Sequence, residues 1–364
     1  MRARPQDLTI SLAIGQTHTI RTKGPDNRPR QHTLCGVLMH SSLVVAPTAL
    51  PLGLAAARFW TRKKFKGTNT LKRSVNQARI PIEHKESHRW LANLRQATDR
   101  LGDPDRCVHV GDREADIYEL FCEADEADTH FLVRTCVDRL AEAGDTTIDQ
   151  EMAHAERGFH TVQWIDPRGK RNKAKLELRY HRLTVRPPIG KRKRYPSLSL
   201  TAIHAKEVKP PKDRKPIVWK LLTDLPIASL KGAKEKLDGY AMRWKIETYH
   251  KVIKSGCRAE DARLRTAQRL TNLLSIYCIV AWRVFWLCML TNEEELRILD
   301  KVAPKPPPSR GGTVGDYLTT LARLGGYLSR AYDPPPGNTV LWRGMVRLMD
   351  IALGHALARR DIGN

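Results

Sequence analysis

The sequence lacks the cysteine pattern of a disulfide-stapled or zinc-stapled protein. Its 7 cysteines are odd in number and scattered, and no two of them form a C-x-x-C pair. We therefore expect neither a disulfide framework nor a structural zinc site, and interpret the cysteines as free thiols of a cytosolic protein. No apolar run of signal-peptide length follows Met1, so nothing in the sequence directs export.

Long apolar runs are also scarce. The stretch Leu273–Leu290 approaches membrane-spanning length, but it carries Arg283 in its middle. An arginine at the centre of a bilayer costs roughly 2.5–3.5 kcal/mol on insertion scales. We therefore predict a buried helix of a soluble core and no membrane partner.

Acidic residues are few relative to basic ones. The 364 residues include 63 Lys and Arg against 39 Asp and Glu, which gives a net charge of +24, while 41% hydrophobic residues are typical of a globular chain. A chain this basic favours a polyanionic partner, with nucleic acid first and an anionic membrane second. This charge makes an enzyme that acts on small neutral substrates less favoured.

Alternating segments predict an α/β organisation. Strands are expected in 34–46, 50–60, 107–110 and 131–134, and helices in 87–100 and from Asp112 onward. Between 150 and 222, four alternating runs predict an antiparallel β module with basic turns at 168–171, 191–194 and 209–215. These turns are equally compatible with solvated loops and with a surface that faces nucleic acid. Helices are expected in 233–292 and 316–360, joined by a proline-rich linker at 303–312.

The segment Tyr240–Lys254 predicts a helix that Gly256 closes as a C-cap. At about 100° per residue, one stripe faces the core and consists of Met242, Ile246, Tyr249 and Ile253. A second sector carries one carboxylate, two cations and a phenol, namely Glu247, Arg243, Lys254 and Tyr240. It is either a solvated strip with an ordinary Arg243–Glu247 pair or a metal-binding carboxylate with cations directed at phosphates. The second interpretation needs further carboxylates, for which Asp112, otherwise a helix N-cap, and Asp7 are candidates.

Together these residues resemble a family. Tyr240, Arg243, Glu247 and Lys254 fit Y-x2-R-x3-E-x6-K, the signature helix of the insertion-sequence-four family of bacterial cut-and-paste DDE transposases. The segment Gly111–Glu119, GDREADIYE, is similar to the one that carries the family's second Asp, and Gln6–Thr9 to the one that carries the first. Two C-terminal segments, 321–327 and 341–344, resemble the family's C-terminal helical region.

The resemblance implies an RNase H-like α/β core with an inserted antiparallel β module and a helical C-terminal region. The corresponding divisions are 1–149 and 226–300 for the core, 150–225 for the module, and 301–364 for a helical region used in dimerisation. The implied reaction is DNA end cleavage through a hairpin, followed by strand transfer. Asp7, Asp112 and Glu247 would hold two Mg²⁺ or Mn²⁺ ions. Tyr240, Arg243 and Lys254 would contact phosphates, and Trp219 would either stack on a flipped base or pack on its strand.

The implied partners are transposon-end and target DNA and a second copy of the chain, in the cytoplasm at the bacterial nucleoid. Only six residues precede Asp7, and Leu8 stands where the family usually has Thr. We therefore expect the family's N-terminal DNA-end-binding domain to be absent, through truncation or a start assigned downstream. Two alternatives remain: an inactive remnant that binds DNA or inhibits the full-length enzyme, and a basic RNA-binding protein.

Overall fold

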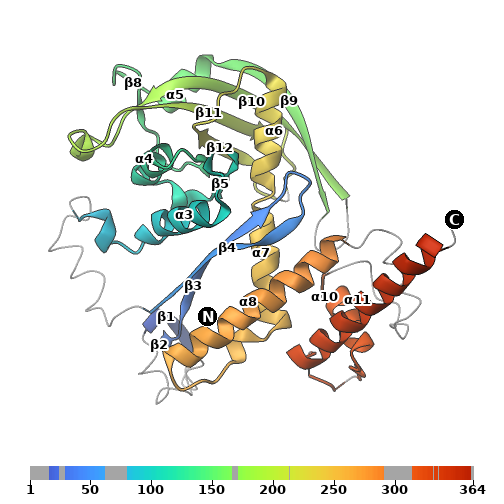
Figure 1. Ribbon diagram of the computed structural model, residues 1–364. Helices are drawn as coiled ribbons and strands as arrows, with labels where there is room; N and C mark the ends of the chain where they lie inside the picture. The colour runs from blue at the N-terminus through green and yellow to red at the C-terminus, as the bar shows by residue number, and fades with distance from the viewer. Residues whose placement is uncertain are drawn as a thin grey trace.

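The computed structural model describes residues 16–23, 29–61, 80–165, 171–212, 214–290, 314–330, 332–334 and 336–361. They form a mixed α/β fold around a mixed β-sheet (Figure 1). The main sheet runs in the order β5-β6-β12-β11-β10-β7-β8. The strand β9 pairs with the first part of β10, residues Arg171–Tyr180.

The main sheet joins two kinds of strand. β5 (Val108–Gly111) and β6 (His130–Arg134) are parallel, whereas the longer strands pair antiparallel, namely β9 (Glu156–Ile165), β10 (Arg171–Val185), β11 (Leu198–Glu207) and β12 (Val218–Thr223). The alternating runs therefore predicted these strands correctly. Two-residue strands, β7 (Leu140–Ala141) and β8 (Thr146–Thr147), complete one end. Because β12 also pairs with β6, the antiparallel strands continue the parallel pair within a single sheet.

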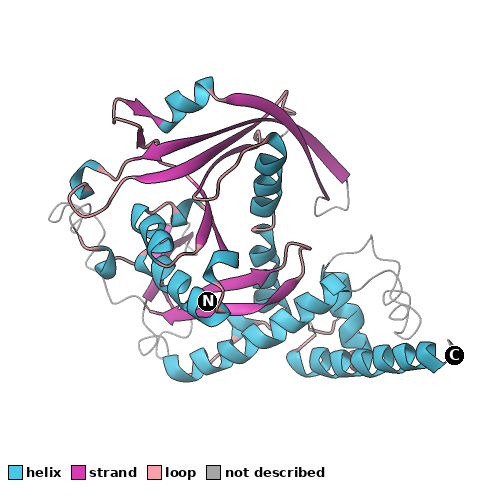
Figure 2. Ribbon diagram, turned by 45° about the horizontal axis from the view of Figure 1, so that its top comes forward, coloured by secondary structure: helices cyan, strands magenta, loops and turns pink. Residues whose placement is uncertain are grey.

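Helices cover both faces of this sheet (Figure 2). One face packs against α3 (His88–Leu101), α4 (Tyr118–Glu126) and α5 (Ile148–His154), which share a buried apolar cluster with the strands. The other face packs against α6 (Leu230–Ala241) through buried residues such as Leu237. Both faces of the central strands are thus buried, which explains why β11 is apolar on both sides rather than strictly alternating.

The helix predicted over 87–100 is confirmed as α3. Leu91 and Leu94 are buried on the expected face, with Trp90 partly buried beside them. The helix ends at Gly102, whose φ of 74° is left-handed and whose amide bonds to the Thr98 carbonyl. Glycine adopts this conformation without the steric cost that a side chain would add.

Two hairpins lie outside the main sheet. The runs predicted at 34–46 and 50–60 supply the second hairpin, whereas the strand Gln16–Lys23 of the first was not predicted. β1 (Gln16–Lys23) pairs with β2 (Pro29–Cys35), and β3 (Leu38–Val45) pairs with β4 (Pro51–Trp60). The β3–β4 hairpin packs between α3 and α8 (Ala267–Leu290), and the Trp282 indole of α8 donates to the Pro51 carbonyl at 3.1 Å.

The apolar stretch Leu273–Leu290 lies within α8. Leu274, Ala281 and Phe285 are buried in an apolar cluster shared with the segment around Tyr249 and with the C-terminal helices, whereas Ile276 and Ile279 are exposed. The predicted burial therefore applies to one face of the helix. No helix in the described part of the chain has the length and apolarity needed to cross a membrane.

The C-terminal helices α10 (Val314–Leu324) and α11 (Asn338–Asp361) pack with their backbones in contact. A Cβ on Gly325 would lie 1.8 Å from the Val340 carbonyl oxygen, and one on Gly344 would lie 1.7 Å from that of Leu321. Only glycine permits this approach, which accounts for both residues in the C-terminal segments. The linker predicted at 303–312 lies outside the described residues.

Candidate active site

Asp112 follows the carboxyl end of β5. Its Oδ1 accepts a hydrogen bond from the Glu114 amide at 2.9 Å and caps a 3₁₀ turn, Arg113–Ala115. The prediction of a helix that begins at Asp112 is wrong, because the backbone of Asp116 leaves the helical region at ψ 66° and α4 begins only at Tyr118. Asp112 therefore lies at the edge of the sheet, half-buried, rather than in the first turn of a long helix.

Gly111 makes this sharp exit from β5 possible. A Cβ on Gly111 would lie 2.4 Å from the Cβ of Ala115 and 3.4 Å from Val133 Cγ2. The 3₁₀ turn folds back directly over the end of the strand, so there is no room for a side chain at this position.

The helix predicted over Tyr240–Lys254 is interrupted. α6 ends at Ala241, α7 spans Trp244–Lys251, and a π turn, Val252–Gly256, follows. The break consists of i→i+3 bonds, such as Arg243 N to Tyr240 O at 3.0 Å, which tighten the backbone. Gly256 ends the π turn without a left-handed φ, so it is not the predicted C-cap.

Three members of the predicted core-facing stripe, Ile246, Tyr249 and Ile253, pack into the core as expected. Tyr249 and Ile253 are fully buried, and Ile246 packs against the same cluster. This stripe fixes the rotation of α7 about its axis, which directs Glu247 away from the core.

Arg243 and Glu247 form the predicted i,i+4 pair, with Arg243 Nη2 2.9 Å from Glu247 Oε1. The Arg243 side chain is only 17% exposed and lies over the Trp244 ring at 5.1 Å, whereas Glu247 is 47% exposed. Arg243 Nε has no hydrogen-bond partner among the described residues. The guanidinium is thus held in place while part of its donor capacity is unused.

Tyr240 is buried, at 3% exposure, and not in a solvated strip as the helical wheel predicted. Tyr240 belongs to α6 and lies on the same buried face as Ala233 and Leu237, so it packs on the sheet, where its ring meets that of Trp219 edge-on at 5.4 Å. Trp219 therefore packs on the strand face and on Tyr240, and remains partly exposed. Burial raises the pKa of Tyr240, the charges of Arg243 and Arg134 oppose this rise, and Asp112 adds to it.

Arg134, at the end of β6, is a further candidate residue beside Tyr240 that the sequence did not indicate. Its Nη2 donates to the Val218 carbonyl at 2.8 Å, and its charge acts on Tyr240. No motif in the sequence marks it, because its proximity to Asp112 and Tyr240 arises from the pairing of β6 with both β5 and β12.

His40, on β3, is a second residue that the sequence did not reveal. The pKa of His40 is lowered to about 4, chiefly by burial and also by the charges of Arg89 and His250, while Asp112 acts in the opposite direction. His250 lies one helical turn after Glu247, and its Nε2 is 2.9 Å from the Ser41 hydroxyl. The charges of Asp112 and of the α7 residue His250 therefore both act on His40.

Lys254 lies in the π turn at the far end of this segment. Its Nζ is 3.6 Å from Glu260 Oε1, and its side chain is largely exposed. The wider π turn rotates Lys254 relative to its predicted position on an α-helix. The structure therefore brings Tyr240, Arg243 and Glu247 together, while the recorded ion pair of Lys254 is with a different carboxylate.

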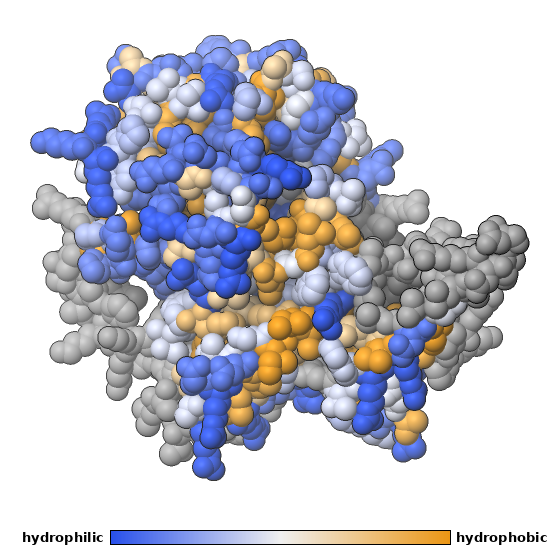
Figure 3. Space-filling model, in the orientation of Figure 1, coloured by the Kyte–Doolittle hydropathy of each residue, from blue (hydrophilic) through white to orange (hydrophobic). Residues whose placement is uncertain are grey.

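The basic turns of the β module are partly neutralised by acidic residues. Lys191 pairs with the buried Glu119, Arg194 with Glu83, and Arg214 with Glu207. Exposed cations nevertheless remain in these turns, including Arg192, Lys193, Lys209, Lys212 and Lys215. Hydrophilic side chains cover much of the upper face of the molecule (Figure 3). The first basic turn, at 168–171, lies almost wholly outside the described residues.

The carboxylates of Asp112 and Glu247 are of the ligand type that a hard divalent cation requires, since Mg²⁺ and Mn²⁺ prefer oxygen ligands. Asp112 and Glu247 each keep part of the carboxylate accessible. Asp7 lies outside the described residues, and within those residues no group of three His, Cys, Asp or Glu side chains is arranged to hold a metal. The described donors are therefore two members of the predicted set.

No protein-family model matches the chain.

Proposed function

We propose that the chain is a DDE transposase of the insertion-sequence-four family, with an RNase H-like core that catalyses metal-dependent DNA cleavage and strand transfer. The observation that carries the proposal is that the charges of Asp112 and of two residues of the Glu247 segment, Arg243 and His250, act on the same two side chains, Tyr240 and His40. The parallel β5–β6 pair, joined through α4 and covered by helices on both faces, supports an RNase H-like core.

Two divalent ions, Mg²⁺ or Mn²⁺, held by Asp112, Glu247 and Asp7, would activate a water or a 3′-hydroxyl and stabilise the leaving oxygen. The protein's own residues position the DNA. Trp244 holds the Arg243 guanidinium in place beside Glu247, so Arg243 suits a phosphate near the cut that displaces Glu247 from it. Arg134 adds a second cation beside Tyr240, and Lys254 offers an exposed third.

Trp219 has a more limited role in this proposal. Its ring is already in contact with Tyr240, and the remaining partly exposed surface is what a flipped base would stack on. Such stacking is worth about 1–3 kcal/mol per base. The proposed partners are double-stranded DNA, as transposon ends and target, and a second copy of the chain in the DNA complex. The proposed location is the cytoplasm, at the bacterial nucleoid.

Nicking of a supercoiled plasmid in the presence of Mn²⁺ tests the proposal. We expect Glu247→Ala and Asp112→Ala to abolish nicking, and EDTA to abolish that of the wild type. Glu235→Ala removes an exposed carboxylate from α6 and is the matched control that keeps full activity. Full nicking rates in both site variants would refute the proposal. Salt-sensitive DNA binding by the wild type, without nicking and without a Mn²⁺ binding signal in calorimetry, would favour the inactive remnant.

A further inference from the structure

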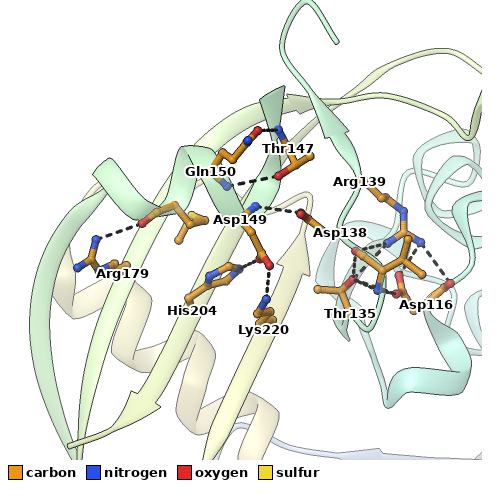
Figure 4. Close-up of polar contacts among 12 residues, drawn as sticks. Asp116, Thr135, Asp138, Arg139, Thr147, Asp149, Gln150, Arg179, His204 and Lys220 are labelled. Atoms are coloured by element: carbon orange, nitrogen blue, oxygen red, sulfur yellow. Dashed lines mark hydrogen bonds and ion pairs between the residues drawn. The ribbon is translucent and has the colours of Figure 1, made fainter. Parts of the chain in front are cut away.

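Asp116, the second aspartate of the GDREAD segment, forms a buried ion pair that the proposed chemistry does not use. Its side chain is 0% exposed and that of Arg139 is 6% exposed, and Arg139 Nη2 lies 2.6 Å from Asp116 Oδ1 (Figure 4). Arg139 also lies over the Phe121 ring at 5.3 Å, which holds the guanidinium against the core.

The other carboxylate oxygen of Asp116 accepts hydrogen bonds from the loop that follows β6. Asp116 Oδ2 accepts hydrogen bonds from the Thr135 hydroxyl at 2.9 Å, the Cys136 amide at 2.7 Å and the Val137 amide at 3.1 Å. Arg139 Nη1 donates in turn to the Thr135 hydroxyl at 3.2 Å. One carboxylate thus organises three successive residues of this loop, together with the arginine that balances its charge.

These contacts link the two loops that carry the candidate site. β5 and β6 are parallel and pair through Gly111 and Val133, so the loops leave the same edge of the sheet side by side. Asp112 begins the first loop, and Asp116 ends the 3₁₀ turn that follows it. Arg134 directly precedes Thr135 in the second loop.

We infer that Asp116, with Arg139, is a positioning residue that fixes the Asp112 carboxylate relative to the Arg134 guanidinium. The functional value of this role rests on the proposed function, in which Asp112 binds metal and Arg134 binds phosphate. A buried ion pair contributes little net stability compared with apolar residues of the same shape. What Asp116 supplies is therefore geometry, because its hydrogen bonds hold backbone atoms of both loops.

The chain contains a second Arg–carboxylate pair that serves as a control, although its arginine is 55% exposed where Arg139 is 6% exposed. Arg95 of α3 forms a two-pronged ion pair with the largely buried Glu123 of α4. This pair also links two elements, but both are helices of the packed face and neither residue belongs to the loops at the carboxyl ends of β5 and β6. Losing it tests the general effect of removing such a pair.

The experiment compares two double variants that leave no unpaired buried charge, Asp116→Ala/Arg139→Met and Glu123→Ala/Arg95→Met. Residue-level amide hydrogen exchange reports on Glu114, whose amide donates to Asp112. We expect exchange at Glu114, Cys136 and Val137 to become at least about tenfold faster in the Asp116 variant only. Isothermal calorimetry with Mn²⁺ is expected to show a Kd about 10- to 100-fold weaker, as for other residues that orient a metal ligand.

A conservative variant separates hydrogen bonding from charge. Asp116→Asn/Arg139→Met keeps an oxygen that accepts from the Cys136 and Val137 amides, so protection at Glu114 should return to within about threefold of the wild type.

The inference is overturned if exchange at Glu114 is the same in the Asp116 double variant as in the Glu123 control. Should the wild type bind no Mn²⁺ while Glu114 still loses protection, the positioning role stands and the proposed function fails. If the wild type binds Mn²⁺ and the Asp116 double variant binds it equally well, the positioning role is refuted and the proposed function survives.

Discussion

Gly111→Ala should displace the candidate carboxylate Asp112 by adding a single methyl group. The new Cβ would lie 2.4 Å from Ala115 Cβ, where carbon atoms normally stay about 3.5–4.0 Å apart. The Cβ of Ala115 is fixed to its buried backbone and has no rotamer to change, so relieving the clash requires the 3₁₀ turn to move by roughly 1 Å. Overpacking of this kind costs about 1–3 kcal/mol of stability, and a displacement of this size costs on the order of 10²-fold in rate.

Urea denaturation measures the loss of stability, and plasmid nicking with Mn²⁺ measures the loss of activity. Gly239→Ala is the matched control, since its Cβ would have nothing within 4 Å and would lie within α6. Alanine in a helix is favoured over glycine by about 1 kcal/mol, so this control should be slightly more stable than the wild type and equally active. The steric reasoning is refuted if Gly111→Ala matches Gly239→Ala in both assays.

The remaining predictions concern pH and helix packing. Burial lowers the pKa of His109 to about 4 from an unfolded value of 6.5, so the unfolded chain takes up the proton first as the pH falls. The stability contribution of neutral His109 is present above pH 6.5 and is lost between pH 6.5 and 4, at up to roughly 1.4 kcal/mol per pH unit. His109→Gln should therefore lose less stability than the wild type between pH 7 and pH 5 in urea titrations, and equal losses would contradict the assignment. Gly344→Ala should separate α10 from α11, because its Cβ would meet the Leu321 carbonyl oxygen at 1.7 Å, whereas Gly354→Ala meets no atom within 4 Å. Thermal unfolding and limited proteolysis should detect this difference, and identical behaviour of the two variants would count against close backbone packing.

The long strands of the main sheet were predictable from the sequence because their patterns are local, whereas β1 and the two-residue strands β7 and β8 were not predicted. The runs that became β10, β11 and β12 alternate or are rich in apolar residues, and each is bounded by proline or lysine-rich turns. Helix boundaries near the site were not predictable in the same way. The breaks at Asp116 and after Ala241 occur where tertiary hydrogen bonds and burial compete with helical continuity. The helix propensities of the residues around these two positions do not predict either break.

The candidate site was predictable in part for a similar reason. Asp112, Arg243 and Glu247 came from short motifs, and the Arg243–Glu247 contact follows from helical spacing alone. Arg134 and His40 enter the site through strand pairing and through packing of the β3–β4 hairpin, which connect residues distant in the chain. Burial of Tyr240 also depends on its contact with Trp219, 21 residues earlier.

The Arg243–Glu247 pair links the two binding events of the proposed function. Without ligands, the guanidinium neutralises the carboxylate at 2.9 Å. A divalent ion must compete with Arg243 for Glu247, and a phosphate must compete with Glu247 for Arg243. Each ligand therefore releases the residue that the other needs, and reciprocity requires that each tightens the binding of the other. Calorimetry should accordingly give a lower Kd for Mn²⁺ when DNA is present than when it is absent. In Arg243→Ala, Glu247 has no such competitor, so Mn²⁺ should bind more tightly without DNA and gain less from its addition. An unchanged gain in that variant would show that the coupling arises elsewhere.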